Sequence, residues 1–213
     1  MITANPVTIA GLILAGGRGE RLGGAIKSEL VVGGRRLFDR VAERLDECSP
    51  LLVAHGRMAP ALLHLPEAVL PIPDIEGDYA GPLAGLAAAM AWCAEATRAP
   101  EFLVSAAVDT PFLPADYVSR LAAAIGNDDV AMASYGGQPY PTNAIWRVAR
   151  FLDLPAQVAA ATAPRSLKRL AGSASSVIVE WPATASGDPF ANINTPEDLA
   201  TAQNRSSDQG ADI

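Results

Sequence analysis

Short apolar runs alternate with helix-patterned segments along this chain, and that alternation limits the possible fold more than any other feature. The apolar runs lie at residues 8–15, 51–55, 68–72, 102–108 and 129–134, and the helix-patterned segments lie at 37–47, 82–97 and 114–125. Short buried strands separated by helices are typical of an open, mostly parallel sheet with helices on both faces. We therefore expect a three-layer α/β fold.

The length of the chain favours one domain. With 213 residues, of which 50% are hydrophobic, the chain can bury one sizeable core. We expect residues 1–213 to form a single domain. The last residues, NRSSDQGADI, are polar and show no periodic pattern, so we expect the tail to be disordered from about residue 204.

The charge balance and the lack of long apolar stretches exclude several classes of protein. The 16 Lys and Arg residues against 23 Asp and Glu give a net charge of −7. This charge repels nucleic acid and anionic membranes, and we expect neither as a partner. No stretch resembles a membrane span or a signal peptide, so we expect a cytoplasmic protein. Cys48 and Cys93 lack the spacing of metal ligands and are expected to stay reduced in the core.

A glycine-rich segment with three cations follows the first apolar run. It reads LILAGGRGERLGGAIKSEL from Leu12 and carries Arg18, Arg21 and Lys27. Glycine lets backbone N–H groups approach an anion, and the cations add positive charge there. The Walker pattern requires glycine immediately before Lys-Ser, where this chain has Ile26, and the dinucleotide fingerprint fails at Leu22. The segment is therefore suited to wrapping a nucleoside triphosphate in another geometry, although a plain turn is the alternative interpretation.

Carboxylates follow two of the other apolar runs. Asp74, Glu76 and Asp78 come after residues 68–72, and Asp109 ends the uncharged run 102–108. Ligands of such sheets bind beyond the carboxyl ends of the strands. A carboxylate there can hold Mg²⁺, which neutralises a triphosphate and makes pyrophosphate a better leaving group. A turn or helix-capping role for Asp109, and a solvated loop for the other three acidic residues, are the structural alternatives.

Four motifs together resemble those of the molybdenum cofactor guanylyltransferases, which belong to the wider nucleotidyltransferase family that includes the sugar-nucleotide pyrophosphorylases. The motifs are LILAGGRGERLGGAIK, GPLAG, VDTPFLP and FANINTPEDL, and the resemblance extends from Leu12 to about Ala202. It implies a Rossmann-like fold of the nucleotide-diphospho-sugar transferase type. The implied reaction is transfer of GMP from Mg·GTP to the terminal phosphate of molybdopterin or molybdenum-molybdopterin, which releases pyrophosphate. Molybdenum-insertion proteins and molybdoenzyme chaperones are the implied protein partners.

The resemblance also implies roles for individual residues. Catalytic roles fall on Asp109, Lys27 and Arg21, and Asp109 would be the Mg²⁺ ligand. The nucleotide-binding residues implied are Leu14, Ala15, Gly16, Gly17, Arg18, Lys27, Asp74 and Asp109. The acceptor-binding residues implied are Tyr140, Asn143, Asn192 and Asn194. The chain departs from the family pattern at the end of the second apolar run, where Ala54 replaces a common asparagine.

Two other functions remain open from the sequence. A cytidylyltransferase acting on molybdopterin or on a sugar or polyol phosphate would use the same fold, and its choice of base would distinguish it. A non-catalytic molybdopterin-binding protein could keep the glycine loop without needing Asp109.

Overall fold

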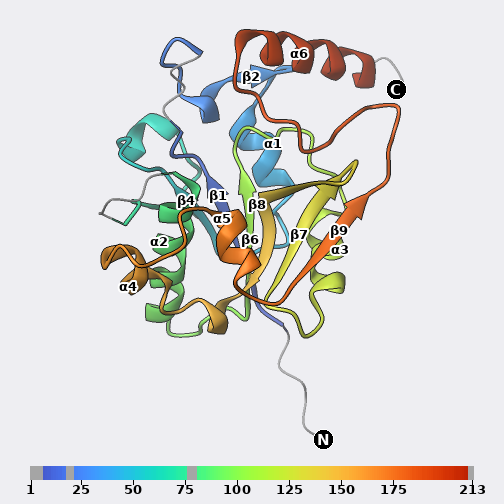
Figure 1. Cartoon of the computed structure of the whole chain (residues 1–213). Coiled ribbons are helices and arrows are strands. Elements are labelled where there is room, and N and C mark those ends of the chain that lie inside the picture. Colours follow the sequence, from blue (N-terminus) through green and yellow to red (C-terminus); the bar gives the residue numbers. More distant parts are fainter. Residues whose placement is uncertain (1–6, 18–21, 76–80, 211–213) are drawn as a thin grey trace, which may run out of the picture.

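The computed structural model describes residues 7–17, 22–75 and 81–210, and its centre is a seven-stranded sheet (Figure 1). The strand order across the sheet is β5-β4-β1-β6-β8-β7-β9. The strands are β1 (Ile9–Leu14), β4 (Leu51–Ala54), β5 (Val69–Ile72), β6 (Phe102–Ala107), β7 (Val130–Tyr135), β8 (Gln138–Arg147) and β9 (Ser176–Trp181). Strand β8 pairs antiparallel with β6 and β7, whereas the other pairs in this sheet are parallel. The expected mostly parallel sheet is confirmed.

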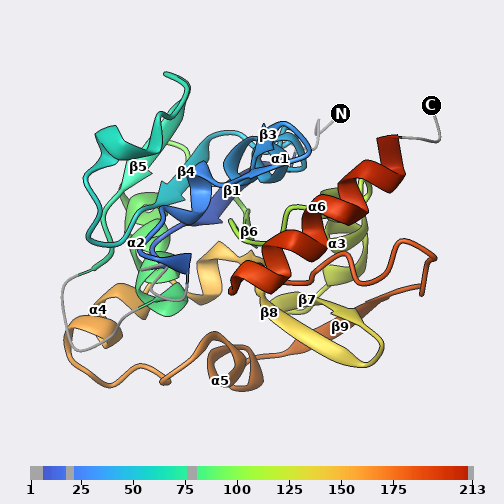
Figure 2. The same cartoon turned by 90° about the horizontal axis from the view of Figure 1, so that it is seen from above.

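Helices cover both faces of the sheet (Figure 2). The α-helices are α1 (Leu37–Glu43), α2 (Pro82–Glu95), α3 (Tyr117–Ile125), α4 (Leu154–Ala159), α5 (Leu167–Gly172) and α6 (Pro196–Gly210). Helices α2, α4 and α5 pack on one face and α1 and α3 on the other, each group with its own buried apolar cluster. The described residues also include the short 3₁₀ helices η2 (Lys27–Glu29), η3 (Pro60–Leu63) and η4 (Val148–Arg150). The expected layer arrangement is therefore confirmed.

Strand β1 shows why the central strands are continuous apolar runs in the sequence. Leu12 and Leu14 belong to the apolar cluster that contains α2, whereas Ile13 belongs to the cluster that contains α1. Alternate side chains of a strand point to opposite faces, so a strand covered on both sides must be apolar at every position. This strand lies between β4 and β6, at the centre of the parallel half of the sheet.

The C-terminal part of the chain differs from the sequence prediction. The tail expected to be disordered from about residue 204 is helical as far as Gly210, because its polar side chains bind distant parts of the chain. Gln203 accepts a hydrogen bond from the backbone N–H of Gly33 and donates one to the carbonyl of Val31. Arg205 donates to the carbonyl of Asp188 at 2.6 Å. The Gln203 contacts hold α6 beside the small hairpin of β2 (Val31–Val32) and β3 (Arg35–Arg36), as Figure 1 shows.

No helix in the described part of the chain combines the length and the apolar character that crossing a bilayer requires.

Candidate active site

A cavity of about 140 Å³ lies at the carboxyl ends of β1, β4 and β6. This edge is where open α/β sheets bind their ligands. The described residues that line the cavity are Leu14, Gly16, Gly17, Lys27, Ala54, Asp74, Gly81, Pro82, Gly85, Ala107, Val108, Asp109, Thr142 and Asn192. The topology therefore brings the glycine segment, Asp74 and Asp109 together around one space.

Close backbone packing shapes the glycine side of the cavity. The loop after β1 passes so near the loop after β4 that a Cβ atom on Gly16 would lie 3.2 Å from the Cα and N atoms of Gly56. Glycine at position 16 therefore allows the two loops to touch. Gly17 also lines the cavity, and the backbone N–H of the neighbouring Ala15 donates to the carbonyl of Ala54.

Two of the expected phosphate-binding cations, Arg18 and Arg21, lie outside the described residues. The same is true of Glu76 and Asp78 from the acidic loop.

Lys27, Asp109 and Asn194 meet at one edge of this cavity although they are far apart in the sequence. The Nζ atom of Lys27 lies 2.6 Å from Oδ2 of Asp109 and 2.7 Å from Oδ1 of Asn194. The side chains of Lys27 and Asp109 are only 12% and 11% exposed. A nearly buried ion pair depends on both partners, because removal of one leaves a charge with little solvation. The arrangement therefore fixes an ammonium group and a carboxylate at the cavity wall.

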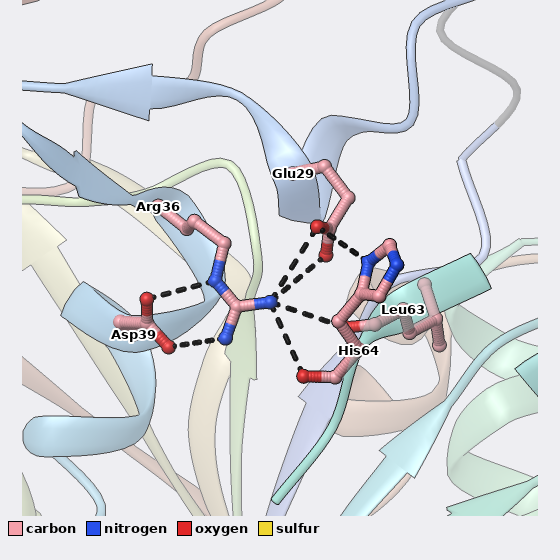
Figure 3. A network of polar contacts seen from close by, with 5 residues as sticks. All are labelled: Glu29, Arg36, Asp39, Leu63 and His64. Atoms are coloured by element: carbon pink, nitrogen blue, oxygen red, sulfur yellow. Dashed lines mark hydrogen bonds and ion pairs between the residues drawn. The ribbon is translucent and has the colours of Figure 1, made fainter. Parts of the chain in front are cut away.

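A polar network anchors the short helix η2 that carries Lys27 (Figure 3). The guanidinium of Arg36 donates two hydrogen bonds to Asp39, at 2.8 and 2.7 Å, and a third to Glu29 at 3.2 Å. Arg36 lowers the pKa of Asp39 through these bonds. The same guanidinium binds the carbonyl of His64, whose Nδ1 lies 3.0 Å from Glu29 Oε2. Glu29 is two residues after Lys27, so the network fixes the lysine segment against α1 and η3.

The segment before α6 places the two asparagines. The backbone N–H of Ile193 donates to the carbonyl of Asp109 at 2.9 Å, which joins this segment to the end of β6. Oδ2 of Asp198 accepts hydrogen bonds from the backbone N–H groups of Asn194 and Thr195, each at 2.9 Å. These bonds lower the pKa of Asp198, and the positive charge of Lys27 adds to the effect. Asn192 thus lines the cavity while Asn194 holds Lys27.

Asp74 lies on the α2 side of the cavity. Burial raises the pKa of its carboxyl group, and a hydrogen bond from the backbone of Gly56 acts in the opposite direction. A Cβ atom on Gly85 would lie 3.4 Å from Oδ1 of Asp74, so the first turn of α2 lies against this carboxyl group. A half-buried carboxyl group with acceptor oxygens is a candidate for binding N–H or O–H groups of a ligand.

The two β8 residues expected to bind the acceptor do not line this cavity. Asn143 is fully buried, and its Oδ1 accepts from the backbone N–H of Ala107 at 3.1 Å. Tyr140 donates to Asp188, and its ring packs at a tilt against that of Phe190. The register of β8 with β7 shifts between Met132 and Ala133, and an irregularity of this kind cannot be located from apolar periodicity. The neighbouring residue that does line the cavity is Thr142, which sequence reasoning did not select.

Asp109 fits the role of a magnesium ligand by the chemistry of its surroundings. Within the described residues, no group of three or more His, Cys, Asp and Glu side chains is placed to hold a metal ion. Mg²⁺ differs from zinc in that it is commonly held by one or two carboxylates together with the phosphate oxygens of a substrate. One carboxylate beside two asparagine amides, in a cavity with a glycine-rich wall, suits such a substrate-bound ion.

The two cysteines offer no nucleophile to this site. Both are unpaired and buried, and burial raises the pKa of each thiol to about 12. A thiol with that pKa is protonated at neutral pH and is a poor nucleophile.

The fold and this site define a class of protein, the nucleotidyltransferases. The family described as the MobA-like NTP transferase domain matches residues 11–177, and the chain belongs to that family. The resemblance inferred from the four motifs is confirmed.

Two relatives match nearly the whole length of the chain. The chain is 36% identical over 207 residues to a molybdenum cofactor guanylyltransferase from Bradyrhizobium sp. (strain ORS 278), covering 95% of each chain. It is 41% identical over 199 residues to a molybdenum cofactor guanylyltransferase from Rhodobacter capsulatus, covering 92% of this chain and 96% of that protein.

Solved structures share the fold. Molybdopterin-guanine dinucleotide biosynthesis protein A from Archaeoglobus fulgidus superposes with a TM-score of 0.70 at 23% identity, covering 94% of this chain and all of that chain. The 2-C-methyl-D-erythritol 4-phosphate cytidylyltransferase from Thermus thermophilus superposes with a TM-score of 0.67 at 18% identity, with the same coverage. Proteins named for different nucleotides therefore share this architecture. The fold alone does not determine which nucleotide base is bound.

Proposed function

We propose that this protein transfers GMP from GTP to the terminal phosphate of molybdopterin or molybdenum-molybdopterin. The products are a guanine dinucleotide form of the cofactor and pyrophosphate. The proposal is supported by the family to which the chain belongs and by the names of relatives that match nearly its whole length. The observation that carries the proposal is that Lys27, which Asn194 binds, meets Asp109 at the wall of the cavity that Gly16 and Gly17 also line.

The reaction is a displacement at phosphorus. An oxygen of the acceptor phosphate forms a bond to the α-phosphorus of GTP, and the bond from that phosphorus to the bridging oxygen breaks, so pyrophosphate leaves with the bonding electrons. Such a step needs positioning and charge stabilisation more than covalent catalysis. In this account the backbone of Gly16 and Gly17 approaches the triphosphate. Lys27 neutralises charge that builds on the phosphoryl oxygens.

Asp109 would hold Mg²⁺, with the amide oxygens of Asn192 and Asn194 beside it. The bound ion would supply positive charge to the triphosphate and to the leaving pyrophosphate. Lys27 donates to Oδ2 of the same carboxylate in the structure, so its ammonium group would lie beside both Asp109 and the phosphates of Mg·GTP. Asn194 gives Lys27 a second hydrogen-bond partner.

The nucleoside would lie between β1, β4 and α2. Leu14 and Ala54 supply apolar walls there, and Asp74 supplies a carboxyl group. Guanine presents adjacent N–H donors that a carboxyl group can accept, and ribose presents hydroxyl donors. Asp74 is the proposed contact to one of these groups.

The Asp109→Asn variant tests this proposal. Substitution with asparagine keeps the size of the side chain and removes its charge, so we expect dinucleotide formation from molybdopterin and Mg·GTP to fall about 100- to 1,000-fold. Circular dichroism verifies folding, and Asp46→Asn, at an exposed position away from the cavity, serves as the matched control. A folded Asp109→Asn protein with wild-type turnover would contradict the role given to Asp109 and favour a different metal ligand, whereas a wild-type protein that forms no dinucleotide would contradict the proposed function and favour a binding protein.

A further inference from the structure

We infer that Asn143 is a positioning residue, which holds the end of β6 in the place where Asp109 can bind Mg²⁺. Asn143 is not among the described residues that line the cavity, whereas Asp109 is. The side chain of Asn143 acts through the backbone that lies between them. The inference rests on the proposed function, because that function makes Asp109 the ligand of the metal ion.

Strand β8 stops pairing with β6 before β6 ends. The ladder between the two strands ends with Ser105 opposite Ala144, whereas β6 continues to Ala107. Close to the same place, the register of β8 with its other neighbour, β7, shifts between Met132 and Ala133. A bulge of this kind disrupts the ladder locally. The last residues of β6 therefore need another partner for their buried backbone groups.

The side chain of Asn143 is that partner. Its Oδ1 accepts a hydrogen bond from the backbone N–H of Ala107 at 3.1 Å. Asn143 is fully buried, and its Nδ2 has no hydrogen-bond partner in the part of the chain that the structure describes. The polar role of the side chain is therefore carried by Oδ1. This oxygen supplies, at Ala107, the bond that the backbone ladder no longer provides.

The turn that carries Asp109 begins at the same residue, Ala107. The carbonyl of Ala107 accepts hydrogen bonds from the hydroxyl of Thr110 at 2.7 Å and from the backbone N–H of Thr110 at 3.2 Å. Between them, Val108 donates its backbone N–H to the carbonyl of the last residue of β1 at 3.1 Å. The turn is thus held by β1 on one side and by β8 on the other.

The position of this turn matters because the Asp109 carboxylate has a defined partner in a nearly buried place. Its Oδ2 lies 2.6 Å from Nζ of Lys27, and its side chain is only 11% exposed. Groups that orient a metal-ligating side chain typically contribute about 10- to 100-fold to metal affinity or activity. Loss of the Asn143 acceptor should therefore weaken metal binding at Asp109 although Asn143 itself touches no ligand.

The Asn143→Val variant tests this inference in the full chain, because valine suits a strand and lacks the acceptor oxygen. The Kd of a fluorescent GTP analogue is measured with Mg²⁺ and then with EDTA in place of Mg²⁺. The ratio of the second value to the first reports how much the metal ion strengthens binding. We expect the variant to lower this ratio by about tenfold. The Kd in EDTA should keep its wild-type value, because Lys27 and the glycine loop are unchanged.

Ile145→Val is the matched control. Ile145 is fully buried in the same strand, but it lies opposite Val104 in the paired part of the ladder. This variant should lower the urea midpoint and leave the ratio unchanged. Asn143→Ala removes the same acceptor without adding a branched side chain, and it should lower the ratio as Asn143→Val does. In an Asp109→Asn background, Asn143→Val should change the ratio no further, because the carboxylate through which it acts is absent.

The outcomes separate this inference from the proposed function. Wild-type protein that binds the analogue more tightly with Mg²⁺ but forms no dinucleotide would overturn the function alone, and a lower ratio in Asn143→Val would still support the inference. A folded Asn143 variant with the wild-type ratio would overturn the inference, whatever the turnover. An equal fall in Ile145→Val, an equal weakening with and without Mg²⁺, or a further fall in the Asp109→Asn background would also overturn it.

Discussion

At the scale of single residues, the contact between Lys27 and Asp109 is the central feature of the site. Both side chains are nearly buried, and each neutralises the other at 2.6 Å. One carboxylate oxygen of Asp109, Oδ2, is therefore held by an ammonium group. Since a metal ion and an ammonium compete for the same carboxylate, the lysine should weaken metal binding to the free protein and strengthen triphosphate binding.

The Lys27→Ala variant should separate these two effects. Without the ammonium, Mn²⁺ used as a probe for Mg²⁺ should bind the nucleotide-free protein more tightly, by about tenfold, because Asp109 is no longer neutralised. GTP should bind more weakly because a charged partner of the phosphates is lost. Titration of free Mn²⁺ by electron paramagnetic resonance at pH 8 measures the first effect, and Lys27→Arg, which keeps the charge, is the control. Unchanged or weaker Mn²⁺ binding by Lys27→Ala would show that the lysine does not restrain the carboxylate.

Some of these residues could be predicted from sequence and others could not. Asp109 and Lys27 stood out because a lone carboxylate after an uncharged run and a lysine in a glycine-rich segment are unusual patterns. Asn143 was expected at the acceptor from the family resemblance alone; in the structure its amide oxygen accepts from the backbone N–H of Ala107, and it does not line the cavity. Thr142 could not be found, because the register shift in β8 decides which of these neighbours borders the cavity.

At the scale of elements, the approach of α2 to the strand ends determines the nucleotide side of the cavity. A Cβ atom on Gly85 would lie 2.8 Å from the Cβ of Ala54 and 3.0 Å from a methyl carbon of Leu14. All three residues line the cavity. The glycine therefore sets how closely the first turn of α2 can lie against β1 and β4, and so sets the width of the space between them.

The Gly85→Ala variant should move the first turn of α2 outward. Overpacking of this kind typically costs about 1–3 kcal/mol, so we expect a lower urea midpoint together with weaker binding of GTP. Gly172→Ala is the matched control, since a Cβ at that helical position meets nothing within 4 Å and should leave stability equal or slightly higher. Equal stability and GTP affinity in Gly85→Ala and wild type would contradict the close contact that the structure shows.

Elements differed in how well the sequence predicted them. The buried strands β1 and β6 and the alanine-rich α2 were clear, because strands buried on both faces and helices packed on a sheet leave strong apolar patterns. Strand β8 was not identified, since it contains two prolines and several polar residues. Strand β9 was not identified either, because it lies at the sheet edge and alternates exposed with buried residues. The end of α6 is held by long-range polar contacts, which local sequence patterns do not encode.

At the scale of the whole molecule, the fold brings three distant segments to one edge of one sheet. The order β4-β1-β6 places the loops after these strands side by side, and α6 closes the site by holding Asn194 against Lys27. The arrangement suits a reaction at phosphorus beside Asp109 and Lys27, which both line the cavity.

The measurement that tests this account most directly compares GTP with CTP as the nucleotide donor. Purified protein is supplied anaerobically with Mg²⁺ and molybdopterin, pyrophosphate release is followed, and the pterin product is identified by mass spectrometry. Protein groups that form hydrogen bonds to guanine are left without partners when cytosine binds. We therefore expect GTP to be used at least about tenfold faster than CTP, with the guanine dinucleotide as product. Equal or faster turnover of CTP, or pyrophosphate release without a guanine dinucleotide, would contradict the account.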